Sequence, residues 1–267
     1  MTASVHPSAI VEPGARLGEG VVVGPFCHIG ASVEIGAGGV LHSHVAVAGR
    51  TRIGPGARIF PFASIGAPSQ DLKAALREGL VVIGADCIIR EGVTINAGAD
   101  AGARIGDRCA FLAYSHVAHD CRIGSDVVLA NQALLGGHVE IGDHASVGGG
   151  AAIHQNVRIG AHAFVGGLAG VEGDVIPFGL AGGNRAHLFG LNLVGLRRRG
   201  FSAERIAHLK AAYRKLFGKE EARALRQRLE EVAATYSGDA DVMQILDFLR
   251  APAQRPLCAP RPRPQNA

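Results

Sequence analysis

Three histidines of this chain have a spacing that suggests shared chemistry. His119, His138 and His154 are 19 and 16 residues apart, and His116 precedes His119 by three residues. A histidine side chain can accept a proton near neutral pH, so it could activate a hydroxyl group for acyl transfer. Three histidines can also hold zinc in an open catalytic site. The alternative is chance placement of these residues at exposed turns.

Two glycines, Gly136 and Gly137, directly precede His138. Backbone N–H groups that a substrate can approach closely are able to stabilise an oxyanion. This pair fits acyl transfer, but the signal is weak by itself because the chain contains 38 glycines.

A six-residue repeat explains how distant histidines could come together. Between Val5 and Val171 an apolar residue recurs in 26 hexads, with interruptions at 66–82 and 96–104. This period fits a short strand and a tight turn, stacked as a solenoid in which three hexads form an 18-residue coil. The histidine separations lie within two residues of one coil, so we expect the three side chains on one edge of successive coils. Nearly nine coils would form a prism roughly 40 Å tall.

The repeat also predicts the domain organisation. Residues 1–181 form the solenoid, and the loop 66–82 protrudes from it, where function is commonly placed. A helical C-terminal domain follows over 182–250, with helices at about 202–217, 220–235 and 239–250 that could cap the open end. The Pro-rich residues 251–267 are expected to be disordered.

The composition agrees with a narrow solenoid interior. Tryptophan is absent and aromatic residues make up 5% of the chain, so Val, Ile, Leu and Ala must fill the core. Cys27, Cys87, Cys109 and Cys121 each occupy the small-residue position of a hexad. They are predicted to be core fillers rather than metal ligands or disulfide partners.

The charge is concentrated in one region. Residues 196–230 contain 11 Lys and Arg against 4 Asp and Glu, although the whole chain has a net charge of only +4. Such a surface suits an acidic partner or phosphates, and the alternative is a solvated helical face. The sequence shows no signal peptide and no apolar run near the ~18 residues of a spanning helix. We therefore expect a cytoplasmic protein without integral membrane contact.

Several segments have distinctive local sequences, at 62–66, 70–73, 89–91, 117–121, 136–139, 154–155, 189–192 and 195–201. Together they resemble the UDP-N-acetylglucosamine O-acyltransferases that start lipid A biosynthesis, over about residues 5–250. The resemblance implies an all-β solenoid, a left-handed parallel β-helix of hexapeptide repeats, with a C-terminal α-helical subdomain. It also implies a homotrimer with active sites between neighbouring subunits, and no nucleic-acid partner.

The resemblance assigns three catalytic residues. His119 would be the general base that takes the proton from the sugar 3-hydroxyl as this oxygen attacks the thioester of a 3-hydroxyacyl-acyl carrier protein. Asp120 would tune or orient His119, although successive strand residues tend to point in opposite directions. Gly137 would donate its backbone N–H to the oxyanion. No metal and no redox cofactor is expected.

The resemblance also implies substrate-binding residues, which are Gln70, Asp71, Lys73, His116, His138, His154, Gln155, Asn192, Arg198 and Arg199. Asp71 and Lys73 would contact the sugar and other polar groups, and Asn192 would face the nucleotide. Arg198 and Arg199 would bind the diphosphate or the phosphopantetheine of the carrier. Gly167 matches a position that gauges acyl-chain length, and glycine there predicts a longer acyl chain. The acidic carrier protein would account for the basic segment.

Three departures from the family pattern leave alternatives open. Asn96-Ala97-Gly98-Ala99 stands where the family often has His-Arg-Gly-Thr, Tyr114 replaces an asparagine, and Val194 replaces an acidic residue. A nucleotide sugar with a 3-amino group, which would give an amide product, is one alternative acceptor. A zinc enzyme resembling the γ-carbonic anhydrases is a second reading, and a non-catalytic solenoid that binds acyl carrier protein or phospholipid precursors is a third.

Overall fold

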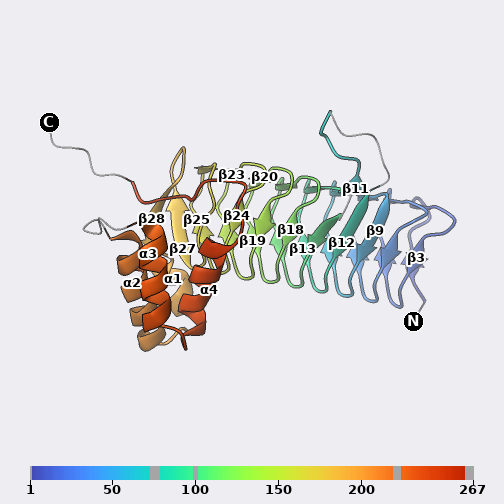
Figure 1. Ribbon diagram of the computed structural model, residues 1–267. Helices are drawn as coiled ribbons and strands as arrows, with labels where there is room; N and C mark the ends of the chain where they lie inside the picture. The colour runs from blue at the N-terminus through green and yellow to red at the C-terminus, as the bar shows by residue number, and fades with distance from the viewer. Residues whose placement is uncertain (1, 73–78, 99–101, 219–223, 262–267) are drawn as a thin grey trace.

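The computed structural model describes residues 2–72, 79–98, 102–218 and 224–261 of the 267-residue chain (Figure 1). The described part is a long prism of stacked coils with a helical unit at its C-terminal end. Three parallel sheets form the faces of the prism, because each two-residue strand pairs with the strand one coil away. The predicted left-handed β-helix of hexapeptide repeats is confirmed.

The first face, sheet A, contains β1 (Ser4–Val5), β4 (Val22–Val23), β7 (Val40–Leu41), β10 (Arg58–Ile59), β13 (Ile88–Ile89), β16 (Ala110–Phe111), β19 (Val128–Leu129), β22 (Ser146–Val147), β25 (Phe164–Val165), β27 (Gly179–Gly182) and β28 (His187–Leu191). The second, sheet B, contains β2 (Ile10–Val11), β5 (His28–Ile29), β8 (Ala46–Val47), β11 (Ser64–Ala67), β14 (Thr94–Asn96), β17 (His116–Val117), β20 (Leu134–Leu135), β23 (Ala152–Ile153) and β26 (Gly170–Val171). The third, sheet C, contains β3 (Arg16–Leu17), β6 (Glu34–Ile35), β9 (Arg50–Ile53), β12 (Leu80–Ile83), β15 (Ala103–Ile105), β18 (Arg122–Ile123), β21 (Glu140–Ile141) and β24 (Arg158–Ile159).

The chain runs from sheet A to B to C in each coil, so the prism has three edges, named here A–B, B–C and C–A by the sheets that each turn connects. Both interruptions of the repeat lie at the B–C edge. The first follows β11 and ends at β12, and the second follows β14 and ends at β15. The B–C edge is therefore where the sequence departs most from the hexad.

The apolar hexad positions form the core, as the repeat predicts. Ile29, Ile89 and Leu129 end their strands and are fully buried, and so are Val33 and Val127 at the small-residue position. The four cysteines at this position are free and buried, which confirms their interpretation as core fillers: Cys27, Cys87, Cys109 and Cys121. Small, β-branched and leucine side chains fill most of this interior, and Phe111 is the one phenylalanine buried in this core cluster of the described residues.

The C-terminal unit begins with an antiparallel hairpin of β27 and β28 that extends sheet A. Four helices follow, α1 (Leu193–Arg198), α2 (Ala203–Phe217), α3 (Leu225–Thr235) and α4 (Ala240–Arg250), and they gather at one end of the prism (Figure 1). The Ser202 side chain accepts from the Arg205 N–H at 3.2 Å and begins α2 as predicted. Helix α1 was not predicted. Among the described residues, no helix combines the length and apolar character needed to cross a membrane.

The expected disorder of the C-terminal segment is wrong for residues 251–261. The Asp174 N–H donates to the Pro256 carbonyl, and the Cys258 N–H donates to the Asp174 carbonyl, both at 2.8 Å. Cys258 is only 4% exposed, so this segment packs apolar side chains as well as pairing its backbone. Proline is compatible with such an edge pairing, because the bonds use carbonyls and non-proline amides. Residues 262–267 lie outside the described part.

Candidate active site

The three histidines singled out by spacing lie on one edge, as predicted. His119 is the second residue after β17, His138 is the third after β20, and His154 is the first after β23. All three therefore belong to turns of the B–C edge on successive coils. Asp120, His138 and Asn156 share the third turn position, so they follow one another at intervals of one coil.

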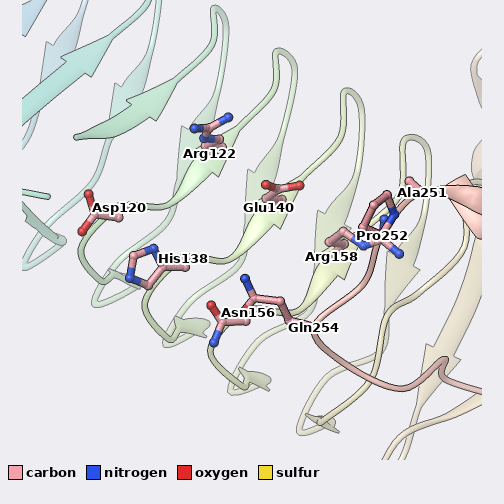
Figure 2. Close-up of a pocket in the computed structure, with 9 residues that line it drawn as sticks. All are labelled: Asp120, Arg122, His138, Glu140, Asn156, Arg158, Ala251, Pro252 and Gln254. Atoms are coloured by element: carbon pink, nitrogen blue, oxygen red, sulfur yellow. The ribbon is translucent and has the colours of Figure 1, made fainter. Parts of the chain in front are cut away.

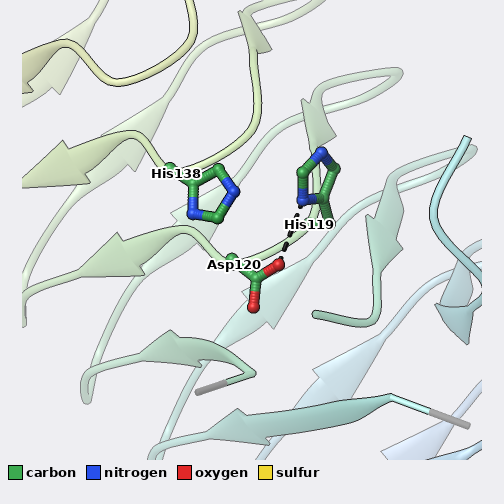
Figure 3. Close-up of side chains that lie close together, drawn as sticks. All are labelled: His119, Asp120 and His138. Atoms are coloured by element: carbon green, nitrogen blue, oxygen red, sulfur yellow. Dashed lines mark hydrogen bonds and ion pairs between the residues drawn. The ribbon is translucent and has the colours of Figure 1, made fainter. Parts of the chain in front are cut away.

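His119 and Asp120 form a hydrogen-bonded pair (Figure 3). The His119 Nδ1 lies 3.0 Å from the Asp120 Oδ2, and the two side chains are 19% and 7% exposed. Strand alternation does not exclude this contact, because Asp120 is a turn residue with φ of +57°. A carboxylate only accepts, so Nδ1 carries the proton and Nε2 keeps its lone pair. His119 is thus prepared to accept a proton at Nε2.

Gly137 lies directly beneath the His119 ring. A Cβ atom added to Gly137 would lie 2.5 Å from His119 Nε2, so only glycine leaves room for this ring. The His138 ring stands edge-on to His119, with centroids 5.0 Å apart and planes at 88°. Within the described chain the Gly137 N–H makes no hydrogen bond. A free backbone donor and an acceptor nitrogen therefore lie together, which is the pairing that acyl transfer needs.

Two residues in the second interruption have structural roles that their sequence did not signal, Gly98 beside the pair and Asn96 beside the first interruption. A Cβ on Gly98 would come within 2.2 Å of Asp120 Oδ1, so Gly98 makes space for the carboxylate. Asn96 is 4% exposed and donates to the Pro68 carbonyl at 3.1 Å. The residues that depart from the family pattern therefore have structural roles. Gly98 makes room for Asp120, and Asn96 anchors the backbone of Pro68 in the first interruption.

A cavity of ≈ 500 Å³ adjoins this pair (Figure 2). Its lining comes from the B–C turns, the outer face of sheet C and the C-terminal segment, namely Asp120, His138, Asn156, Arg122, Glu140, Arg158, Ala251, Pro252 and Gln254. The C-terminal contribution was missed because a Pro-rich composition carries no signal of where the segment packs.

The remaining predicted residues of this edge lie on neighbouring strands and coils. His116 lies on the outer face of sheet B, where its Nδ1 is 2.7 Å from the Thr94 hydroxyl, and burial lowers the pKa of His116. His154 and Gln155 are exposed. Gln70 and Asp71 are exposed after β11, on coils nearer the N-terminus, and Lys73 lies outside the described residues.

The structure does not bring the other predicted residues to the B–C edge, which carries His119, His138 and His154 and is also called the histidine edge below. Asn192, Arg198 and Arg199 line a second cavity of ≈ 740 Å³ together with Phe164 of sheet A and Val194. The Asn192 side chain caps α1 by accepting from the Gly195 N–H, and it donates to the His162 carbonyl, both at 3.0 Å. Its nucleotide contact stays a prediction.

Arg199 and Gly167 are also away from the histidine edge. Arg199 donates to the His144 carbonyl at 2.6 Å. Gly167 is exposed in a turn of the A–B edge, so its role in chain length likewise stays a prediction. A single chain therefore holds two separate groups of predicted site residues.

In the described chain, the residues that could hold a metal ion are His119, Asp120 and His138. One potential ligand atom from each of His119, Asp120 and His138 lies within 4.8 Å of the others (Figure 3). Two imidazoles and a carboxylate are a ligand set that zinc accepts.

Comparison with known proteins shows which family the chain resembles. Residues 174–258 match the family model for domain 2 of UDP-N-acetylglucosamine O-acyltransferase, and residues 102–137 match the bacterial transferase hexapeptide model. An acyl-[acyl-carrier-protein]–UDP-N-acetylglucosamine O-acyltransferase of Rhizobium johnstonii is 45% identical over 262 residues, 97% of this chain and 96% of the relative. The enzyme of the same name from Bartonella henselae is 42% identical over 260 residues, 96% of this chain and 94% of the relative.

Solved structures agree with these relatives. LpxA from Acinetobacter baumannii superimposes with a TM-score of 0.90 at 37% identity, covering 96% of this chain and 99% of the other. The UDP-N-acetylglucosamine acyltransferase of Arabidopsis gives a TM-score of 0.84 at 33% identity, covering 95% and 99%. The similarity thus includes both the prism and the helical unit, and the chain belongs to the acyl-[acyl-carrier-protein]–UDP-N-acetylglucosamine O-acyltransferase family.

Proposed function

We propose that this protein transfers a 3-hydroxyacyl chain from acyl-acyl carrier protein to the 3-hydroxyl of UDP-N-acetylglucosamine, the first step of lipid A synthesis. The observation that carries the proposal is the His119–Asp120 pair over the free N–H of Gly137, beside a cavity of ≈ 500 Å³. Family membership supports the substrate class, and the geometry supports His119 as the base and the Gly137 N–H as the oxyanion donor.

The mechanism follows from these contacts. His119 Nε2 takes the proton of the sugar hydroxyl while its oxygen forms a bond with the thioester carbon. The Gly137 N–H stabilises the resulting oxyanion, and Asp120 stabilises the imidazolium that has formed. When the carbon–sulfur bond breaks, the proton passes from His119 to the departing thiolate of the carrier. The products are the acylated nucleotide sugar and the free carrier thiol.

The test is an acyl-transfer assay that compares UDP-N-acetylglucosamine with its 3-amino analogue across acyl-chain lengths. We expect the hydroxyl acceptor to be used and longer chains to be preferred, because Gly167 has no side chain to block a channel. Val194 lines the second cavity in place of an acidic residue, so the same assay decides whether the amine is the better acceptor. Transfer to neither acceptor would refute the proposal.

The proposed assembly is a homotrimer in which each site combines residues of two subunits. The separation of the histidine edge from the Arg198 cavity supports it, because in a three-membered ring one surface of each copy faces a different surface of the next. Mixing a His119→Ala variant with an Arg198→Ala variant tests it. Randomly reassembled trimers should regain about a quarter of the wild-type sites if the residues come from neighbouring subunits. No recovery would place both residues in one subunit.

The carrier protein is proposed to dock on the helical unit. Helices α1 and α2 expose four basic residues, Arg198, Lys210, Arg214 and Lys215. This basic surface suits an acidic partner. Raising the salt concentration should therefore raise KM for the carrier more than KM for the nucleotide sugar. The cytoplasmic location stays a prediction.

A zinc enzyme remains the second candidate because His119, Asp120 and His138 can approach one ion. In that case these three residues would hold the zinc ion, which would supply a polarised water molecule. Metal analysis of protein purified without added zinc separates the two functions. Stoichiometric zinc together with loss of activity on chelation would favour this second candidate, and transfer activity in metal-free protein would exclude it.

A further inference from the structure

The C-terminal segment 251–261 turns back from α4 along the prism and reaches the B–C edge. Ala251, Pro252 and Gln254 line the cavity beside the His119 pair together with Asp120, His138 and Asn156 (Figure 2). The segment is held in place further along, where Pro256 and Cys258 pair with Asp174. The position of the segment therefore does not depend on contacts within the cavity.

Arg255 connects this segment to two predicted substrate-binding residues. Its Nε donates to the Gln155 carbonyl at 2.9 Å, and another guanidinium nitrogen is hydrogen-bonded to the His154 Nδ1. A guanidinium group can only donate, so His154 must accept at the nitrogen that faces it. The planar fork of the arginine thus fixes the His154 ring and the Gln155 backbone together.

The location of these contacts fits the acceptor substrate. His154 follows β23, two coils from the His119 turn, which is about 10 Å along the edge at the inter-strand spacing. This is the reach of a sugar diphosphate whose sugar hydroxyl lies at His119. His154 and Gln155 present polar groups there, which suit hydroxyl and phosphate oxygens better than an acyl chain.

We propose that residues 251–256 form one wall of the nucleotide-sugar site and that Arg255 is a positioning residue that holds His154 and Gln155 toward the acceptor. This inference rests on the proposed function, since it assigns part of the same site. It predicts that Arg255 affects acceptor binding rather than the chemical step at His119.

The experiment compares Arg255→Ala and Arg255→Lys with the matched control Arg261→Ala, which removes an exposed arginine further along the same segment. Arg255→Ala should raise KM for UDP-N-acetylglucosamine about tenfold, with kcat and KM for the acyl carrier nearly unchanged. Arg255→Lys should recover part of the loss, because an ammonium group can donate to one of the two acceptors but lacks the fork. Arg261→Ala should behave as the wild type, and all three variants should keep the wild-type Tm.

An unchanged acceptor KM in Arg255→Ala would overturn the inference, and so would an increase confined to the acyl carrier. A Tm loss with kcat and both KM values at wild-type levels in the folded fraction would mean that Arg255 only stabilises the fold. Calorimetric binding of UDP-N-acetylglucosamine without acyl donor gives a separate readout, in which Arg255→Ala should weaken Kd about tenfold. Absence of transfer by the wild type would refute the proposed function, whereas the binding experiment would still decide the role of Arg255.

Discussion

The B–C and C–A edges use the same turn but place different residues at its second position. At the C–A edge, Asp107, Ser125 and Asp143 occupy this position on successive coils. The Asp107 carboxylate accepts from the Ala85 N–H at 2.8 Å, the Ser125 hydroxyl from the Asp107 N–H at 3.1 Å, and the Asp143 carboxylate from the Ser125 N–H at 2.8 Å. These polar side chains satisfy the backbone of the neighbouring coil.

At the B–C edge the same position holds His119, Gly137 and Gln155. The His119 side chain turns to Asp120 instead of to a neighbouring amide, and the Gly137 N–H makes no hydrogen bond in the described chain. A polar side chain at the second position therefore stabilises the prism where it bonds to the backbone. Where no side chain bonds to the backbone N–H, as at Gly137, the donor is open to a substrate and a site can form.

The histidines of the two edges differ in the same way. His144 and His162 both occupy the third turn position of the C–A edge, and their rings stack at 4.7 Å with planes at 22°. Phe178 continues this stack at 5.4 Å from His162. Burial, together with the nearby charges of His144 and Arg199, lowers the pKa of His162 to about 4. These histidines act as packed rings, whereas His119 has a carboxylate partner and an adjoining cavity.

The largest effect that separates the edges should come from His119→Ala. Loss of the general base should reduce turnover on the order of 10²–10⁴-fold, while the melting temperature stays near that of the wild type. The control is His44→Ala, because the His44 ring packs against Phe26 and Phe62 at the A–B edge, with ring centroids 5.0 and 5.1 Å away. That variant should keep its turnover. Equal turnover of His119→Ala and the wild type would disprove the mechanism.

A second change should convert the B–C edge into the C–A arrangement. Gln155→Asp places a carboxylate where Asp143 stands on the other edge, so it should accept from the Gly137 N–H and remove it from the oxyanion. Turnover should fall about 10²-fold, the usual effect of losing one oxyanion donor. Gln155→Ala is the control, since it removes the same amide without offering an acceptor. If both variants lose the same turnover, the Gly137 N–H is not the oxyanion donor.

The hexad predicted the fold well because each six-residue repeat corresponds to one short strand and one turn. It located the core, the cysteines and the edge that holds His119, His138 and His154. It did not reveal that Asp120 bonds to His119, because a left-handed turn residue does not follow strand alternation. The packing of 251–261 was also missed, since it depends on a distant pairing with Asp174. The stacked pair His144 and His162 was overlooked, although their spacing of 18 residues is one coil.

A third prediction concerns pH, because His162 should make the C–A edge sensitive to acid. The folded protein binds the His162 proton only near pH 4, whereas an unfolded histidine binds it near its ordinary value of 6.5. The unfolded state therefore takes up protons first, and stability falls as the pH decreases from about 6.5 to 4. His162→Phe keeps the stacking with Phe178 but cannot titrate. Its Tm should drop less than the wild-type Tm between about pH 7 and pH 5, and parallel curves would contradict this assignment.

The smallest effect should come from breaking the backbone ladder of the C–A edge with Asp107→Ala. The Ala85 N–H would lose its acceptor, which should lower the free energy of unfolding by about 1 kcal/mol. Asp107→Asn is the matched control, because its amide oxygen can still accept from Ala85 and should restore most of the stability. Chemical denaturation measures the loss, and the acyl-transfer rate of the folded fraction should stay at the wild-type level. A large fall in that rate would show that the C–A edge also contributes to catalysis. It would contradict the assignment of stability to the C–A edge and catalysis to the B–C edge.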